Sequence, residues 1–88
     1  MPELYITDLK TQLENFKEKA SKDVDMFCYL NNEKVEKLLE QALRIKVYFK
    51  ALKVTEKQMQ ELNSIINQIQ DFADFVNDTN ARRSLGNN

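Results

Sequence analysis

Residues 33–53 read EKVEKLLEQALRIKVYFKALK and carry the most regular hydrophobic pattern of the chain. Apolar residues recur there at alternating steps of three and four, which is the heptad spacing of an amphipathic helix that packs along one seam. Glutamates fill the first half of its polar positions and basic residues the second half, an order that the helix macrodipole favours. We therefore predict a helix over 33–53. Its seam consists of Val35, Leu38, Ala42, Ile45, Phe49 and Leu52.

A second amphipathic pattern precedes this helix. Seven apolar residues keep one helical phase, because at about 100° per residue they stay within a narrow arc. We predict a single helix over 3–30 that ends in a turn at Asn31-Asn32. In the alternative interpretation, Ser21 caps a separate short helix at 22–30, which would make four helices instead of three. The seven residues are Ile6, Leu9, Leu13, Phe16, Ala20, Val24 and Phe27.

The third predicted helix begins after a capping box. Thr55 and Gln58 have the spacing at which each side chain satisfies a free backbone N–H of the first helical turn. The helix extends over 56–77, and residues 79–88 lack an apolar face, so we expect a flexible tail there. Short connections make successive helices antiparallel. The prediction is an all-α antiparallel three-helix bundle formed by residues 1–78. The core-facing residues of the third helix are Leu62, Ile66, Ile69, Ala73 and Val76.

The composition excludes several other classes of protein. Among the 88 residues there is one Gly and one Pro, both close to the chain ends. The tight turns of a β-sheet fold therefore lack the residues that usually form them. The chain contains no His, which removes the commonest general base and the commonest metal ligand. We predict that the protein is not an enzyme and uses no cofactor or metal.

The single cysteine bears on the compartment. Cys28 has no second cysteine in the chain to pair with, so we expect a reducing, cytoplasmic environment and a buried structural thiol. No apolar run reaches the roughly 18 residues of a membrane span, and residues 1–10 lack the apolar core of a signal peptide. The ten Lys against three Arg, with nine Asn, indicate an A/T-rich genome, bacterial or viral.

The central helix carries a second apolar stripe that its seam does not explain. Leu39, Leu43 and Val47 recur at steps of four and lie roughly 100–170° from the seam centre. The stripe is internal if this helix lies between its neighbours or is covered by a helix at 22–30. Otherwise the stripe is a surface for self-association or for binding another protein. Small chains with little apolar core are often stabilised by such association. We predict a partner-binding stripe and a homo-oligomer.

The third helix carries an aromatic residue among acids. Phe75 lies about 130° from the core-facing side of that helix, and Asp71 and Asp74 lie close to it in sequence. An exposed aromatic ring in an acidic patch would suit a basic protein partner. In the alternative, the acids are ordinary surface charge and Phe75 is folded under the tail. We take Asp71, Asp74 and Phe75 as a second candidate binding surface.

A row of lysines provides the alternative function. Lys46, Lys50, Lys53 and Lys57 would share one outer face if the central helix continued that far. Such a row could contact phosphates, which makes a nucleic-acid-associated accessory protein the second hypothesis. The net charge of −1 and the lack of aromatic residues interleaved on that outer face argue against it.

Two acidic pairs allow one enzymatic comparison. Glu33-x-x-Glu36 and Asp71-x-x-Asp74 are similar to the paired acids with which all-α nucleotide pyrophosphohydrolases hold Mg²⁺. The similarity covers only these four residues, and both pairs point away from the helix seams, so no pocket is expected between them. We predict instead a non-enzymatic protein–protein interaction module of the inhibitor, immunity, chaperone or assembly-subunit type, which acts by steric binding or scaffolding.

Overall fold

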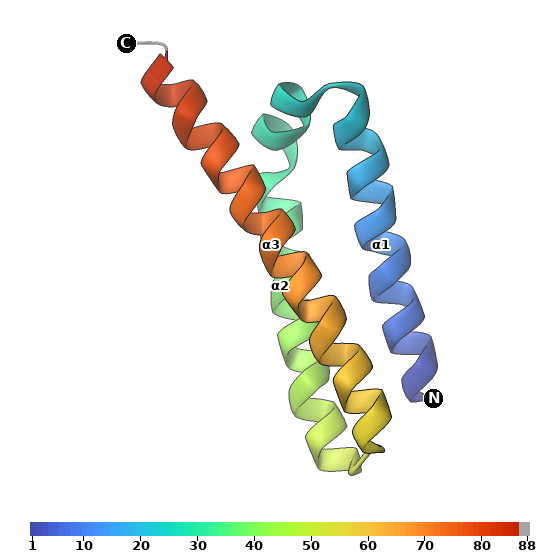
Figure 1. Cartoon of the computed structure of the whole chain (residues 1–88). Coiled ribbons are helices and arrows are strands. Elements are labelled where there is room, and N and C mark those ends of the chain that lie inside the picture. Colours follow the sequence, from blue (N-terminus) through green and yellow to red (C-terminus); the bar gives the residue numbers. More distant parts are fainter. Residues whose placement is uncertain (87–88) are drawn as a thin grey trace.

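The computed structural model describes residues 1–86, with side chains described for residues 1–83, as a bundle of three helices (Figure 1). The helices are α1 (Pro2–Lys22), α2 (Val24–Leu52) and α3 (Glu56–Gly86). Helices α2 and α3 form a long antiparallel hairpin, and α1 packs along one side of it (Figure 1). The predicted all-α three-helix bundle is confirmed, whereas several of the predicted helix boundaries are wrong.

The chain reverses direction at Asp23, between α1 and α2. Asp23 has an extended backbone (φ −157°, ψ 94°), and its carboxylate accepts a hydrogen bond of 3.2 Å from the backbone N–H of Met26. This is the geometry of a helix N-cap. Ser21 does not cap a helix, because its hydroxyl donates to the Glu18 carbonyl at 2.6 Å. The predicted single helix over 3–30 is therefore wrong, and so is the alternative cap at Ser21.

Helix α2 continues through Asn31 and Asn32 without a turn. The side-chain amide of Asn31 donates to the Phe27 carbonyl one helical turn earlier, at 3.1 Å. Asn31 also lies four residues before Val35, and Cys28 lies three residues before Asn31, so both extend the heptad seam upstream. The predicted turn at Asn31-Asn32 and the separate helix at 22–30 are wrong, because packing along this seam outweighs the turn preference of asparagine.

The connection between α2 and α3 follows the sequence prediction. Lys53 adopts the left-handed conformation (φ 54°, ψ 50°) that ends many helices. The Gln58 N–H donates to Thr55 Oγ1 and the Thr55 N–H donates to Gln58 Oε1, each at 3.1 Å. The predicted capping box is thus confirmed. The side-chain amide of Gln58 also donates, through Nε2, to the Glu3 carboxylate at 2.7 Å, and this bond links the start of α3 to α1.

Helix α3 extends well beyond the predicted end near residue 77. Thr79 is buried, and the Asn80 amide donates to the Cys28 carbonyl at 2.9 Å. Arg83 donates to the Asp25 carbonyl at 3.4 Å, and its guanidinium lies 5.1 Å from the centre of the Tyr29 ring. These partners lie in the first two turns of α2, a segment that the prediction assigned to the preceding helix. Residues 79–83 are therefore packed helix and not a tail, while residues 87–88 lie outside the described residues.

Aromatic contacts join the helices near both ends of the bundle. The Phe27 ring of α2 lies 5.8 Å from Phe16 of α1 and 5.9 Å from Phe72 of α3, measured between ring centroids. At the other end, Tyr5 of α1 lies 5.7 Å from Tyr48 of α2. Between these contacts the predicted seam residues form one buried apolar core. Val24 and Leu52, which the sequence analysis placed on core-facing sides, are exposed, because they are the first and last residues of α2.

Replacing Asp23 with Ala should lower the free energy of unfolding by about 1 kcal/mol, because the first turn of α2 loses the acceptor of its N-cap. Urea unfolding followed by circular dichroism measures the change. Asp23→Asn keeps an acceptor and should be nearly neutral, as should Ser21→Ala, since that hydroxyl caps no helix. A larger loss for Ser21→Ala than for Asp23→Ala would contradict the described corner.

Ending the chain after Asp78 should lower the melting temperature by several degrees. The truncation removes the buried Thr79 and the hydrogen bonds of Asn80 and Arg83, and a loss of about 1 kcal/mol corresponds to roughly 4–8 °C in a domain of this size. A chain that ends after Arg83 keeps these contacts and is the matched control. Equal melting temperatures for the chain ending at Asp78 and the full chain would show that these contacts do not stabilise the bundle.

Candidate functional site

One side of α2 is left uncovered by α1. Helix α1 meets α2 where Tyr5 packs against Tyr48, and Leu43 lies about 140° around the helix from Tyr48. Leu43 is 46% exposed and Val47 is 69% exposed. These two apolar side chains therefore lie on a free surface. We call this surface the outer flank and define it by the α2 residues Glu36, Glu40, Leu43, Lys46, Val47 and Lys50.

Helix α3 borders the outer flank with uncharged amides. The Asn77 amide donates to the Glu36 carboxylate at 3.2 Å, which identifies the side of α3 that borders the flank. Gln70 and Asn63 lie at heptad spacing before Asn77 and so share that side. Because the two helices are antiparallel, this amide row lies along the α2 residues Glu36, Leu43 and Lys50. The centre of the surface is thus apolar on α2 and polar but uncharged on α3.

The structure divides the predicted apolar stripe. Leu39 is only 9% exposed and belongs to the core, whereas Leu43 and Val47 are exposed. Each step of four residues turns about 40° around a helix, which moves the stripe from the interface with α3 to the outer surface. Leu39 is therefore an internal residue, whereas Leu43 and Val47 are surface residues.

The three residues of the predicted acidic surface are all exposed on α3. Phe75 is 40% exposed, and its ring packs on Phe72 at 6.1 Å between centroids, where it extends the aromatic cluster. Asp71 lies one turn before Phe75 and is exposed. Asp74 lies about 100° around the helix from Phe75, and its carboxylate accepts a hydrogen bond from Gln70 at 3.0 Å. Asp74 therefore adjoins the amide row, and Asp71 lies between Asp74 and Phe75 around the helix.

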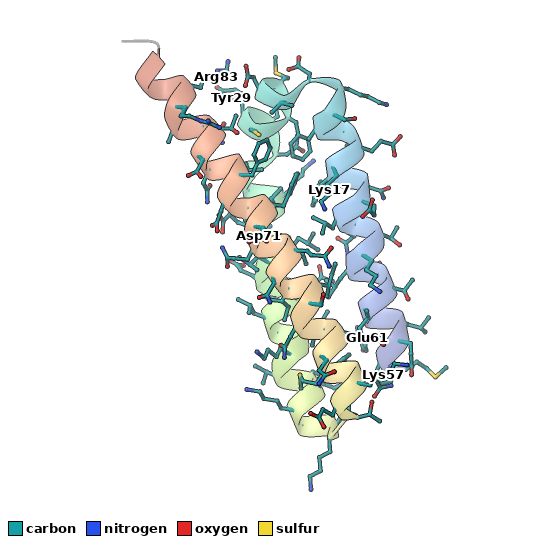
Figure 2. The ribbon with its side chains drawn as sticks, viewed as in Figure 1. Lys17, Tyr29, Lys57, Glu61, Asp71 and Arg83 are labelled. Atoms are coloured by element: carbon teal, nitrogen blue, oxygen red, sulfur yellow. The ribbon has the colours of Figure 1, made fainter. Side chains whose placement is uncertain are left out.

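The four lysines do not lie on one continuous helix. Lys46 is half-buried and Lys50 is exposed on α2, which ends at Leu52. Lys53 forms the left-handed cap, and Lys57 lies on α3, near the end of the bundle opposite Tyr29 and Arg83 (Figure 2). The condition for one basic row, a central helix that continues to residue 57, is not met.

The two acidic pairs form no metal site in the described part of the chain. Glu36 is already hydrogen-bonded to Asn77 and Asp74 to Gln70. Within residues 1–86, no group of three or more His, Cys, Asp or Glu side chains is placed to hold a metal ion. The arrangement of these acids thus offers no support for the pyrophosphohydrolase comparison.

An exposed apolar surface at the corner between α1 and α2 was missed in the sequence. Met26 and Leu30 are exposed there beside Tyr29. Met26 and Leu30 are four residues apart and lie on the side of α2 opposite its seam, which indicates a second apolar surface. The sequence prediction did not identify this surface, because it assigned both residues to the first helix. A shallow hollow of about 190 Å³ lies at this corner. It is lined by Lys19, Asp23, Met26, Phe27, Leu30 and Asn31.

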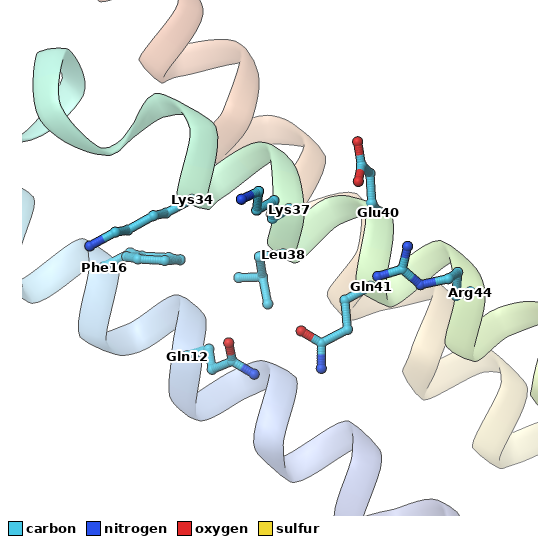
Figure 3. Close-up of a pocket in the computed structure, with 8 residues that line it drawn as sticks. All are labelled: Gln12, Phe16, Lys34, Lys37, Leu38, Glu40, Gln41 and Arg44. Atoms are coloured by element: carbon cyan, nitrogen blue, oxygen red, sulfur yellow. The ribbon is translucent and has the colours of Figure 1, made fainter.

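A wider groove lies between α1 and α2 (Figure 3). Its volume is about 490 Å³, and Phe16 and Leu38 contribute the apolar part of its wall. The charged groups are three cations and one carboxylate, so the groove is basic overall. It depends on the position of α1 beside α2, which residue spacing within one helix does not specify. The charged residues are Lys34, Lys37, Glu40 and Arg44.

The only cysteine is buried, as expected from the sequence. Burial raises the pKa of the Cys28 thiol, contact with the Thr79 hydroxyl opposes that shift, and the nearby charge of Asp25 adds to it. A thiol with a raised pKa stays protonated at neutral pH and is a poor nucleophile. Cys28 is therefore a packing residue in the contact between α2 and α3.

The chain matches no protein-family model, no curated protein and no solved structure. The candidate site therefore depends on the described residues alone. Of these surfaces, the outer flank is the one that combines exposed apolar side chains with a border of amide side chains, which Asp74 adjoins through Gln70. None of the three helices, over the described residues, combines the length and apolarity needed to cross a membrane.

The division of the stripe can be tested by stability measurements. Leu39→Ala should lower the free energy of unfolding by about 2 kcal/mol or more, because it leaves a cavity in the core. Leu43→Ala should change it by less than about 0.5 kcal/mol, since this side chain is exposed at the surface. Urea unfolding of both variants provides the comparison. Equal losses would mean that Leu43 also belongs to the core.

Proposed function

We propose that the protein is a non-enzymatic protein–protein interaction module that binds through the outer flank of α2. The observation that carries this proposal is the exposure of Leu43 and Val47 beside the amide row of α3. Interface centres are depleted in charged residues, because a buried charge without a partner is costly. A surface with apolar residues and amides at its centre and charges at its edges and ends has this composition.

The proposed action is steric. Two long helices present the outer flank as a straight surface, so binding can cover a site on a partner or hold partners together, as in small inhibitors, immunity proteins, chaperones and assembly subunits. The chain has no His and its one thiol is buried, so a nucleophile paired with an imidazole base is not available. The lone cysteine also favours a cytoplasmic location.

The nucleic-acid alternative remains a prediction that gains no support from the arrangement of its residues. Lys50 and Lys53 lie at the end of α2, but Lys57 belongs to another helix. Tyr48, the exposed aromatic residue between Lys46 and Lys50 in the sequence, lies about 160° around α2 from both lysines and packs on Tyr5 of α1, so it is not placed beside them for base stacking. A protein partner therefore remains the better-supported proposal.

Affinity capture tests this proposal. The full chain carrying a tag, and its Leu43→Glu variant, are used to recover proteins from cells of the source organism, and recovered proteins are quantified by mass spectrometry. Leu43→Glu should reduce recovery of the specific partners at least about tenfold, since it places a charge at the centre of the contact. Circular dichroism should show that the variant remains folded.

Leu4→Glu is the matched control. Leu4 is also an exposed leucine on a helix surface, but it lies on α1 and outside the outer flank. This variant should recover the same partners as the wild-type chain. If Leu43→Glu retains all partners of the wild-type protein, the outer flank is not the binding surface.

A further inference from the structure

We infer that the outer flank binds a second copy of this chain, with the two α2 helices packed antiparallel about a two-fold axis at Leu43. This inference deepens the proposed function and rests on it, because it names the occupant of the same surface. The occupant would be a second copy because the charges of the flank are self-complementary.

The charged residues of the outer flank are arranged symmetrically about Leu43. Glu36 precedes Leu43 by the same seven residues by which Lys50 follows it. Glu40 and Lys46 are related in the same way, at three residues on either side. Each acid thus has a base at the equivalent position on the other side of Leu43.

A two-fold axis converts this order into pairs of opposite charge. In an antiparallel arrangement, a residue before Leu43 faces the equivalent residue after Leu43 of the other copy. Glu36 then faces the partner's Lys50, because both residues lie within about 20° of Leu43 around α2. Glu40 and Lys46 lie about 60° to either side of Leu43, Glu40 toward the groove beside α1, so they stay at opposite edges of the interface and do not form a pair. Leu43 meets the partner's Leu43, with Val47 beside this contact. A parallel arrangement would place like charges opposite each other, which costs free energy.

The position of α2 in the fold removes the simplest other explanation of this charge order. The macrodipole acts mainly within the first and last turns of a helix. Because α2 begins at Val24 and not at Glu33, Glu36 and Glu40 lie in its middle, far from its N-terminus. Only Lys50 lies in the last turn. The macrodipole therefore does not account for Glu36, whereas pairing with Lys50 of a second copy does.

The neighbouring helices are compatible with this dimer. Helix α1 lies on the other side of α2, and α3 adds the uncharged row of Asn63, Gln70 and Asn77. Asn77 also holds the Glu36 carboxylate at 3.2 Å, so less side-chain entropy is lost when that carboxylate pairs with a lysine. The exposed apolar area is small and the ion pairs lie at the rim, so the dimer should weaken as salt rises.

Sedimentation equilibrium of the full untagged chain, at several concentrations in low salt with a reducing agent, tests the inference. Wild-type protein should dimerise. Lys50→Glu should raise the dimer dissociation constant at least about tenfold, because symmetry places the new acid opposite Glu36 twice. Lys34→Glu makes the same charge change in the groove beside α1 and should leave the constant unchanged.

Charge exchange provides the decisive variants. Glu36→Lys alone should weaken the dimer like Lys50→Glu, and the double variant Glu36→Lys/Lys50→Glu should restore it. The variants Glu36→Lys and Lys50→Glu should form a heterodimer when mixed, because each new charge then faces an opposite charge of the other variant. Thermal unfolding of each variant verifies that the bundle remains folded, so a loss of association reports on the surface.

The outcomes distinguish this inference from the proposed function. A wild-type chain that is monomeric at all concentrations, or a dimer that neither Lys50→Glu nor Glu36→Lys weakens, overturns the α2–α2 dimer. If that monomer still captures another protein and Leu43→Glu abolishes the capture, the proposed function stands without the dimer. If the dimer forms and responds to both charge changes as stated, the outer flank is its interface.

Discussion

The lengths of all three helices depend on the corner at Asp23, where an extended backbone ends α1 and the carboxylate accepts a hydrogen bond from the Met26 N–H. It begins α2 immediately after the corner, so α2 is long enough to support α3 as far as Arg83. If the corner lay at Asn31, the buried Thr79 would lose its contact with Cys28 and the Asn80 amide would lose its carbonyl acceptor. The position of one local corner thus allows contacts between residues more than fifty positions apart.

Much of the fold could be predicted because its determinants are local or periodic. The seam from Val35 to Phe49 needs only spacing, and the Thr55–Gln58 capping box needs only two residues three apart. The wrong boundaries have a common cause, the assignment of a turn to Asn31. Asparagine favours turns, but a single polar residue is also tolerated at a seam position when its amide is satisfied, as it is here by the Phe27 carbonyl.

The candidate site was less predictable, because sequence spacing specifies an angle around one helix and not the positions of its neighbours. Leu39 and Leu43 differ by about 40° in that angle, yet one is buried and the other exposed because of where α3 lies. Phe75 packs on Phe72, which itself contacts Phe27 of another helix. The basic groove likewise exists only because α1 lies beside α2. Such features require tertiary contacts that no single amphipathic pattern contains.

The two apolar faces of α2 raise one physical question, namely what covers the second face. Within one chain, α1 and α3 cover the seam and the side reaching Leu39, and they leave Leu43 and Val47 in solvent. In the proposed dimer, α2 would contact α1, α3 and the partner's α2, so both apolar faces would be buried. An 88-residue chain gains little further core from its own three helices. Association through α2 adds buried apolar area without a fourth helix, and the charges symmetric about Leu43 restrict that association to one orientation.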